Sequence, residues 1–255
     1  MSDTEKIINS FYLQDELNPN VWFLPKEKRM GDSEGQKPKL KPEIRSRLLK
    51  ISEIFVNYLD ADFFVHDIIL IGSLVGYNWS EFSDFDVHII YNSEEFGDDK
   101  KLYNELFRLK KTVFNASHDI LIKGFEVEMY AQDINDAERS VGSYSIMNDE
   151  WIRFPKKESF SVDKNRIKEK AQQWMDIIDG VLENAEDDDL KSAIELVKKY
   201  KDKLRKYRTC GLSREGEHSY ENLVFKFLRR NGYITKLEKF KNQIVDKKLS
   251  LEHKI

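Results

Sequence analysis

Two acidic side chains, Asp84 and Asp86, form an Asp-x-Asp pair within residues 83–91, a segment whose apolar positions alternate as in a strand. Side chains alternate between the faces of a strand, so both carboxylates point the same way, about 6.5–7 Å apart along the chain. Two carboxylates on one face repel each other unless a cation lies between them. Hard divalent cations prefer oxygen ligands, so we expect Mg²⁺ (or Mn²⁺) to bind here.

A Gly-Ser pair, Gly72 and Ser73, directly follows a short apolar run at residues 67–71 that predicts a buried strand. Glycine lets the backbone turn tightly and approach a phosphate closely. If a helix begins at Ser73, its free N–H groups face the same phosphate, and the serine hydroxyl adds a donor. A phosphate-binding turn beside metal-binding acids suits the transfer of a phosphoryl or nucleotidyl group.

A third carboxylate is expected on the next predicted strand, residues 125–131. Glu126 and Glu128 share one face of that strand, and Val127 and Met129 take the other. We favour Glu128 and keep Glu126 as the alternative, because alternation does not separate them. Three carboxylates are able to hold two cations, one activating the attacking hydroxyl and one stabilising the leaving pyrophosphate.

The order of these motifs resembles the nucleotidyltransferase superfamily with the polymerase-β-like catalytic core. The signature is a Gly-Ser, a spacer, an Asp-x-Asp between apolar positions and a later strand acid, and the resemblance covers roughly residues 44–132. A narrower resemblance, to uncharacterised and often phage-encoded predicted nucleotidyltransferases, rests on less specific segments: Leu17-Asn18-Pro19, Val127-Glu128-Met129-Tyr130, Gly142-Ser143-Tyr144-Ser145-Ile146 and Glu221-Asn222-Leu223-Val224-Phe225-Lys226.

The resemblance implies transfer of a nucleoside monophosphate from an NTP to a hydroxyl of an acceptor, with release of pyrophosphate. It implies that Asp84, Asp86 and Glu128 are catalytic and bind the metal, and that Gly72 and Ser73 bind the nucleotide. ATP is the default nucleotide. The acceptor stays open among RNA (including tRNA), protein and small molecules.

The main alternative is a catalytically weak protein of the same fold that binds a nucleotide or nucleic acid as a regulator, or acts in a toxin–antitoxin pair. The intact Asp-x-Asp counts against it. His88 shares the face of Asp84 and Asp86. It either lies near the cations and acceptor or, as most such histidines do, is held by its neighbours in the sheet.

The surrounding pattern predicts an α+β half followed by a C-terminal α-helical bundle, with a mixed sheet in the first half. Further strands are expected at 120–122, 144–147 and 150–154, and helices at 42–60, 98–115, 163–182, 187–208, 217–231 and 234–247. Asp98 is expected to cap the helix at 98–115, and its inner face to carry Leu102, Leu106, Leu109 and Val113. The domains are then residues 1–41, an arm with a linker-like run at 31–38; 42–160, the catalytic domain; and 161–255, the helical domain.

Charge is distributed unevenly along the 255 residues. The net charge is −4, but residues 190–255 hold 18 Lys and Arg against 8 Asp and Glu, a net of +10. Lys226, Arg229 and Arg230 are spaced to share one helix face, so we expect them to contact the triphosphate or the acceptor. A single cysteine, no apolar run of membrane-spanning length and no secretory pattern indicate a cytoplasmic protein, of a bacterial host if phage-encoded.

Overall fold

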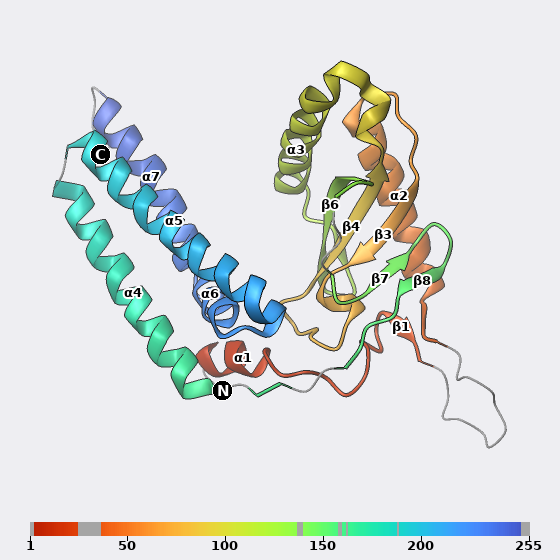
Figure 1. Cartoon of the computed structure of the whole chain (residues 1–255), viewed down its shortest axis with the longest axis horizontal. Helices are drawn as coiled ribbons and strands as arrows, with labels where there is room; N and C mark the ends of the chain where they lie inside the picture. Colours follow the sequence, from red (N-terminus) through yellow and green to blue (C-terminus); the bar gives the residue numbers. More distant parts are fainter. Residues whose placement is uncertain are drawn as a thin grey trace. The chain divides into compact units, whose positions relative to one another are not determined.

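The computed structural model describes residues 3–24, 37–136, 140–157, 160–161, 163–187 and 189–250. The chain divides into two compact units (Figure 1), a sheet unit, Tyr12–Ser159, and a helical unit, Met1–Phe11 with Phe160–Ile255. The predicted α+β class, with a mixed sheet followed by a helical region, is confirmed. None of the described helices is long and apolar enough to span a membrane.

The sheet unit is built on a six-stranded sheet of order β5-β6-β4-β3-β7-β8. The β4 and β6 strands run parallel, and every other neighbouring pair is antiparallel. The strands lie close to the predicted ranges: β3 Asp67–Ile71, β4 Asp84–Tyr91, β5 Leu121–Ile122, β6 Phe125–Asp133, β7 Ser143–Ser145 and β8 Glu150–Arg153.

Alternation along β4 divides the sheet into an apolar face and a polar face. Phe85, Val87 and Ile89 are fully buried in the main core, together with side chains of α2 (Pro42–Leu59) and α3 (Lys100–Ser117). The two helices meet over this face, where the rings of Phe55 and Phe114 lie 5.0 Å apart. Every second side chain of β4 packs in this core, so Asp84, Asp86 and His88 lie on the opposite face of the sheet.

The predicted orientation of α3 is wrong. Leu102, Leu109 and Val113 are 54–65% exposed and Leu106 is half-buried, whereas Phe107 and Phe114 are almost fully buried. The leucines with Val113 and the two phenylalanines both recur at helical spacing. The phenylalanines bury more apolar surface, so α3 packs with their face against the core. The helix begins at Lys100 after a 3-10 segment, η2 (Ser93–Asp99), with Asp99 rather than Asp98 in the N-cap position and no side-chain cap.

The first forty residues do not form a separate arm where the structure describes them. The α1 helix (Asp3–Asn9) packs in the helical unit, with Ile7, Ile8 and Phe11 in its core. Trp22 is buried in the sheet unit, where its Nε1 donates to the Leu74 carbonyl at 2.8 Å. It lies on β1 (Trp22–Phe23), which pairs with β2 (Lys39–Leu40). Most of the linker-like run at 31–38 falls outside the described residues.

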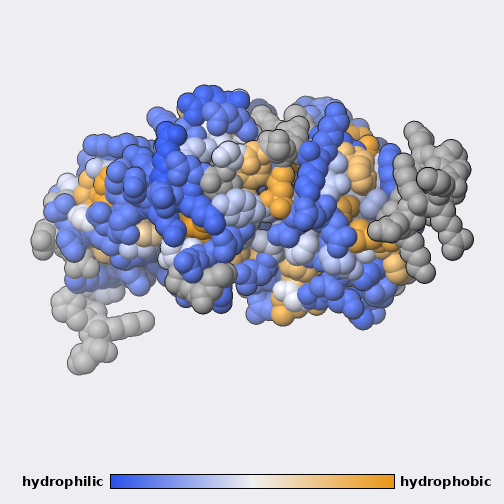
Figure 2. All heavy atoms as spheres, turned by 90° about the horizontal axis from the view of Figure 1, so that it is seen from below, coloured by the Kyte–Doolittle hydropathy of each residue, from blue (hydrophilic) through white to orange (hydrophobic). Residues whose placement is uncertain are grey.

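The helical unit contains four longer helices close to the predicted ranges: α4 Lys164–Asp187, α5 Leu190–Glu215, α6 Tyr220–Arg230 and α7 Tyr233–Leu249. Asp189 caps α5 by accepting hydrogen bonds from the N–H groups of Lys191 and Ser192. A one-turn segment, η3 (Gly216–His218), joins α5 and α6. The face of the molecule drawn in Figure 2 is mostly hydrophilic, with hydrophobic residues in separate small patches.

Candidate metal centre

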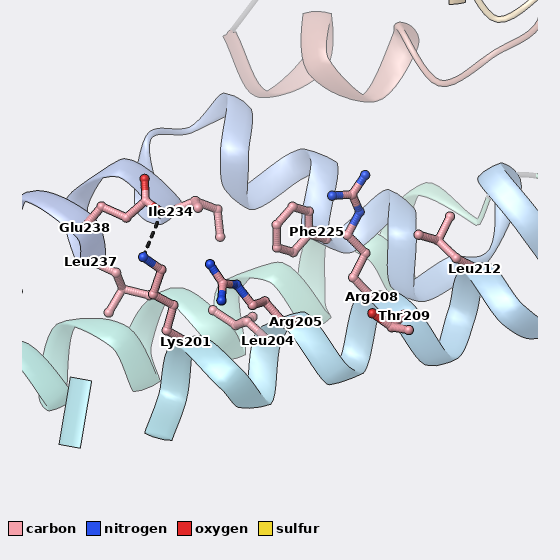
Figure 3. A pocket seen from close by; sticks show the side chains of 10 residues that line it. All are labelled: Lys201, Leu204, Arg205, Arg208, Thr209, Leu212, Phe225, Ile234, Leu237 and Glu238. Atoms are coloured by element: carbon pink, nitrogen blue, oxygen red, sulfur yellow. Dashed lines mark ion pairs between the residues drawn. The ribbon is translucent and has the colours of Figure 1, made fainter. Parts of the chain in front are cut away.

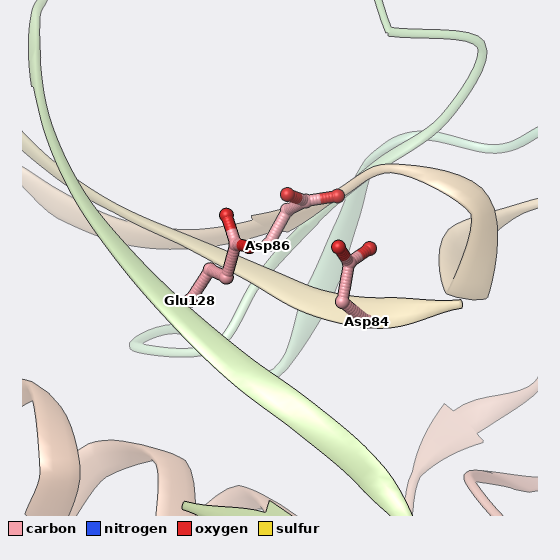
Figure 4. A group of neighbouring side chains, drawn as sticks. All are labelled: Asp84, Asp86 and Glu128. Carbon is pink, nitrogen blue, oxygen red and sulfur yellow. The ribbon is translucent and has the colours of Figure 1, made fainter. Parts of the chain in front are cut away.

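Three carboxylates come together on the polar face of the sheet. Asp84 and Asp86 extend from β4, and Glu128 extends from β6, directly opposite Asp86 in the parallel register. Each residue offers one oxygen, and these three oxygens all lie within 4.8 Å of one another (Figure 4). The strand pairing therefore assembles the acidic group that the spacing of the sequence predicted.

Glu128, and not Glu126, joins the two aspartates. Glu126 faces Asp84 in the strand register but is exposed and lies outside the acidic group. Glu128 is half-buried, and the Tyr130 hydroxyl donates a hydrogen bond to its Oε2. This contact holds the carboxylate beside Asp86.

Gly72 lies against the carboxylate of Asp86. Its φ is +83°, a conformation that side-chain-bearing residues rarely adopt, and it follows Ile71, which pairs with Asp86 across β3 and β4. A Cβ on Gly72 would lie 2.0 Å from Asp86 Oδ2 and 3.0 Å from its Cγ. The glycine is therefore required by the position of the Asp86 carboxylate, a reason that the sequence alone did not reveal.

The Ser73 side chain is hydrogen-bonded to the end of the loop that leads into β4. Its hydroxyl donates to Ser83 Oγ at 2.7 Å, and Ser83 Oγ also accepts from the Ser80 N–H at 2.9 Å. The helix expected to start at Ser73 is a single 3-10 turn, η1 (Ser73–Val75). In this arrangement Ser73 fixes the entry into the strand that carries both aspartates.

Further along the same face, His88 and Tyr130 form a stacked pair. Their rings are 4.6 Å apart and nearly parallel, and His88 Nδ1 is hydrogen-bonded to Gln132 Oε1 at 2.6 Å. Burial lowers the pKa of His88 to about 4, although the hydrogen bond to Gln132 acts in the opposite direction. The imidazole is therefore neutral at pH 7 and is held by its neighbours, which is the commoner of the two roles expected for it.

Tyr130 and Lys111 belong to this site but were not predicted from the sequence. Burial, followed by the hydrogen bond to Glu128, raises the pKa of the Tyr130 hydroxyl, so it remains a donor. Lys111 Nζ, from α3, lies 4.0 Å from the centroid of the Tyr130 ring. Alternation along β6 puts Tyr130 on the face of Glu128 and could have indicated it, but no local pattern links Lys111 to the sheet.

The three basic residues predicted to bind the nucleotide lie on α6 of the helical unit and contact different elements. Lys226 Nζ forms an ion pair with Oε2 of Glu217, a residue of η3, at 2.7 Å. Arg230 donates to Ser10 Oγ and lies over the ring of Phe11. Arg229 is exposed. The described partners of Lys226 and Arg230 thus hold these side chains within the unit.

Comparison of the chain with protein-family models, with curated proteins and with solved structures gives no match. The functional argument therefore rests on the acidic group, on its neighbours and on the order of the motifs.

Proposed function

We propose that this chain is a nucleotidyltransferase that depends on a divalent cation and has a polymerase-β-like core. It would transfer a nucleoside monophosphate from an NTP, with ATP as the default, to a hydroxyl of an acceptor. The observation that carries the proposal is the acidic group of Asp84, Asp86 and Glu128, with oxygens within 4.8 Å of one another.

The donor set fits a hard cation. Mg²⁺ binds oxygen at about 2.0–2.1 Å and Ca²⁺ at about 2.3–2.6 Å, so two oxygens on one ion are at most about 4.2–5.2 Å apart. Oxygens within 4.8 Å of one another therefore need only small side-chain movements to reach one cation. Three neighbouring carboxylates repel one another, and a cation removes that repulsion. Carboxylate oxygens without cysteine or histidine favour Mg²⁺ or Mn²⁺ over the softer transition metals.

Asp84, Asp86 and Glu128 would hold the metal, which when bound would polarise the phosphate oxygens and favour the deprotonated acceptor hydroxyl. In the transfer, the acceptor oxygen forms a bond to the α-phosphorus, and the bond from that phosphorus to the bridging oxygen breaks. Pyrophosphate leaves, and the hydroxyl proton passes to a base. Glu128, oriented by Tyr130, is the carboxylate we propose to orient the acceptor or take its proton.

The arrangement of the motifs supports the same reaction class. Gly72 and Ser73 follow β3, the two aspartates lie on the adjacent β4, and Glu128 lies on the next strand, β6. The three motifs of the resemblance therefore lie on neighbouring strands or directly after one of them. Positioning and charge stabilisation supply most of the catalysis in phosphoryl transfer, and both demand such a fixed constellation.

The test is incubation with each of four α-labelled NTPs and Mg²⁺ or Mn²⁺, with tRNA, protein and small hydroxyl compounds as acceptors. We expect label to move to one acceptor class and pyrophosphate to appear in equal amount. Cation-dependent binding of NTP with no transfer to any acceptor would favour the regulatory alternative. Absence of both binding and transfer would overturn the proposal.

Tyr130→Phe tests the support of Glu128. The variant loses the hydroxyl that donates to Glu128 Oε2 but keeps the ring that stacks on His88. We expect Mn²⁺ affinity, measured by calorimetry, to fall about 10-fold, as is common when a hydrogen bond to a metal ligand is removed. Tyr103→Phe, the same chemical change on α3, is the control and should bind Mn²⁺ as the parent does. Equal affinity in both variants would contradict the role of Tyr130.

A further inference from the structure

A cavity of about 350 Å³ lies in the helical unit, where α5 faces α6 and α7 (Figure 3). Apolar side chains form much of its lining: Leu204 from α5, Phe225 from α6, and Ile234 and Leu237 from α7. Leu204, Phe225 and Leu237 are buried in the unit. The volume is near the lower limit for small-molecule sites, so the cavity suits a compact ligand.

Three cationic side chains of α5 also line this cavity. Lys201, Arg205 and Arg208 are spaced at i, i+4 and i+7, which places them on one face of the helix. Lys201 Nζ forms an ion pair with Glu238 Oε1 at 2.8 Å, drawn as the dashed line in Figure 3. The Lys201 charge is thus balanced within the cavity wall.

Arg208 is held with its guanidinium partly removed from water. Its Nε donates to Oδ1 of the buried Asn222 at 3.0 Å, and its guanidinium carbon lies 4.8 Å from the centroid of the Phe225 ring. Burial lowers the pKa of Arg208, although an arginine this basic stays charged at neutral pH. A charge placed there costs desolvation energy unless an anion compensates it.

Arg205 and Arg208 have no described carboxylate within ion-pair distance, unlike several other basic residues of the unit. The charge of Glu217, which is ion-paired with Lys226, acts on Arg208 from farther away and opposes the effect of burial on its pKa. Figure 3 shows both side chains reaching from α5 toward the side where Phe225 and Ile234 lie. Two guanidinium groups beside an apolar lining form a site with excess positive charge.

We propose that this cavity binds a compact phosphate monoester that carries a flat aromatic group. The planar forks of Arg205 and Arg208 match phosphate oxygens, and Leu204, Ile234 and Leu237 give the ring an apolar surface. A neutral apolar ligand would add no anion beside the half-buried Arg208 and the exposed Arg205, whereas a phosphate would. The proposal is independent of the proposed transferase activity, because the site uses no metal and none of the three carboxylates.

The experiment is calorimetric titration of the full chain in EDTA, so that no divalent cation supports binding at the acidic site. The probes are phenyl phosphate and AMP, with inorganic phosphate and phenol as the two halves of the ligand. We expect phenyl phosphate or AMP to bind about tenfold more tightly than phosphate alone, since ring and phosphate both contribute. Phenol alone should show no measurable binding.

Arg205→Gln tests the cationic side of the site. Arg205 is exposed, so this variant keeps the packing of the unit, and we expect affinity for the preferred phosphate monoester to fall about tenfold. Lys206→Gln makes the same charge change on the same helix, outside the cavity lining, and should leave affinity within twofold. Arg208→Lys keeps the charge but loses the planar fork, and it should also weaken binding.

Three results would overturn the proposal. The first is the absence of binding by both phosphate monoesters in the parent chain. The second is an equal loss of affinity in the Arg205 and Lys206 variants, which would show general attraction to a basic surface. Binding of a single-stranded oligonucleotide without binding of the monomers would likewise reject it in favour of a nucleic-acid surface.

Discussion

Replacing both Asp84 and Asp86 with asparagine is expected to abolish cation-dependent binding of NTP and to lower nucleotidyl transfer by at least about 1,000-fold. Asparagine has nearly the same size and can stay in the strand, but it lacks the negative charge that attracts the cation. The two residues supply two of the three oxygens of the acidic group, so little of the site remains. Thermal stabilisation by each NTP with and without Mg²⁺, followed by label transfer, measures both effects.

The stability of the cation-free protein provides the internal control. Without a cation, the three carboxylates repel one another, so the double variant should unfold in EDTA at the same temperature as the parent or higher. Glu126→Gln is the matched variant, because Glu126 lies on the same face of β6 but is exposed and outside the group. It should retain activity. Undiminished Mg²⁺-dependent NTP stabilisation in the double variant would contradict the metal site.

The strands that carry the site could be predicted because their apolar positions alternate strongly. Phe85, Val87 and Ile89 mark the buried face of β4, so Asp84 and Asp86 are predicted on the opposite face. Glu126 and Glu128 share one face of β6, so the alternation of side chains alone did not show which of them joins the aspartates. The choice depends on the register between β4 and β6 and on the hydroxyl of Tyr130, both of which are set by tertiary pairing.

Other features of the structure depend on contacts between distant segments. The phenylalanine face and the leucine face of α3 both show helical spacing. The packing of α3 on α2 and the sheet decides that Phe107 and Phe114 are buried rather than Leu109. The N-terminal segment divides between the units because Ile7 packs in one core and Trp22 in the other. Composition near the N-terminus contains no sign of either contact.

The +10 charge of residues 190–255 does not form one uniform phosphate-binding surface. Several of its cations pair with acids inside the helical unit: Lys201 with Glu238, Arg214 with Glu221, Lys226 with Glu217 and Lys236 with Asp179. Ion pairing reduces the attraction that these side chains offer to an outside anion. Arg205 and Arg208 are distinguished by the apolar lining beside them, with no described carboxylate within ion-pair distance of either.

Gly72→Ala is expected to damage the acidic site from outside the set of carboxylates. The added methyl group would lie 2.0 Å from Asp86 Oδ2, so the Asp86 carboxylate must leave its present position in the acidic group. We expect Mn²⁺ affinity to fall by about 100-fold, at the upper end of what indirect disturbance of a metal ligand causes. Gly72 also has a ψ of −163°, a backbone conformation essentially confined to glycine, so alanine adds about 1–3 kcal/mol of strain. Calorimetry of Mn²⁺ binding and urea unfolding measure the two consequences separately.

Gly124→Ala is the control that separates backbone strain from the steric clash with Asp86 in the Gly72→Ala variant. Gly124 has a φ of +87°, close to that of Gly72, but a Cβ there meets nothing within 4 Å. This variant should lose about 1–2 kcal/mol of stability and keep the parent's Mn²⁺ affinity. Equal Mn²⁺ affinity in both alanine variants would show that Gly72 is required only for its backbone conformation.

A double-mutant cycle with Asp86→Ala then tests whether the two residues act on each other. In the Asp86→Ala background, the nearest remaining atom to the new methyl group is the Cβ at 3.4 Å, an ordinary contact. Gly72→Ala should therefore cost less stability there than it does in the parent, giving a coupling free energy of about 1 kcal/mol or more. A coupling near zero would mean that the backbone around residue 72 shifts to accept the methyl group. Coupling of the expected size would link the Gly-Ser motif to the Asp-x-Asp motif through direct contact between Gly72 and Asp86.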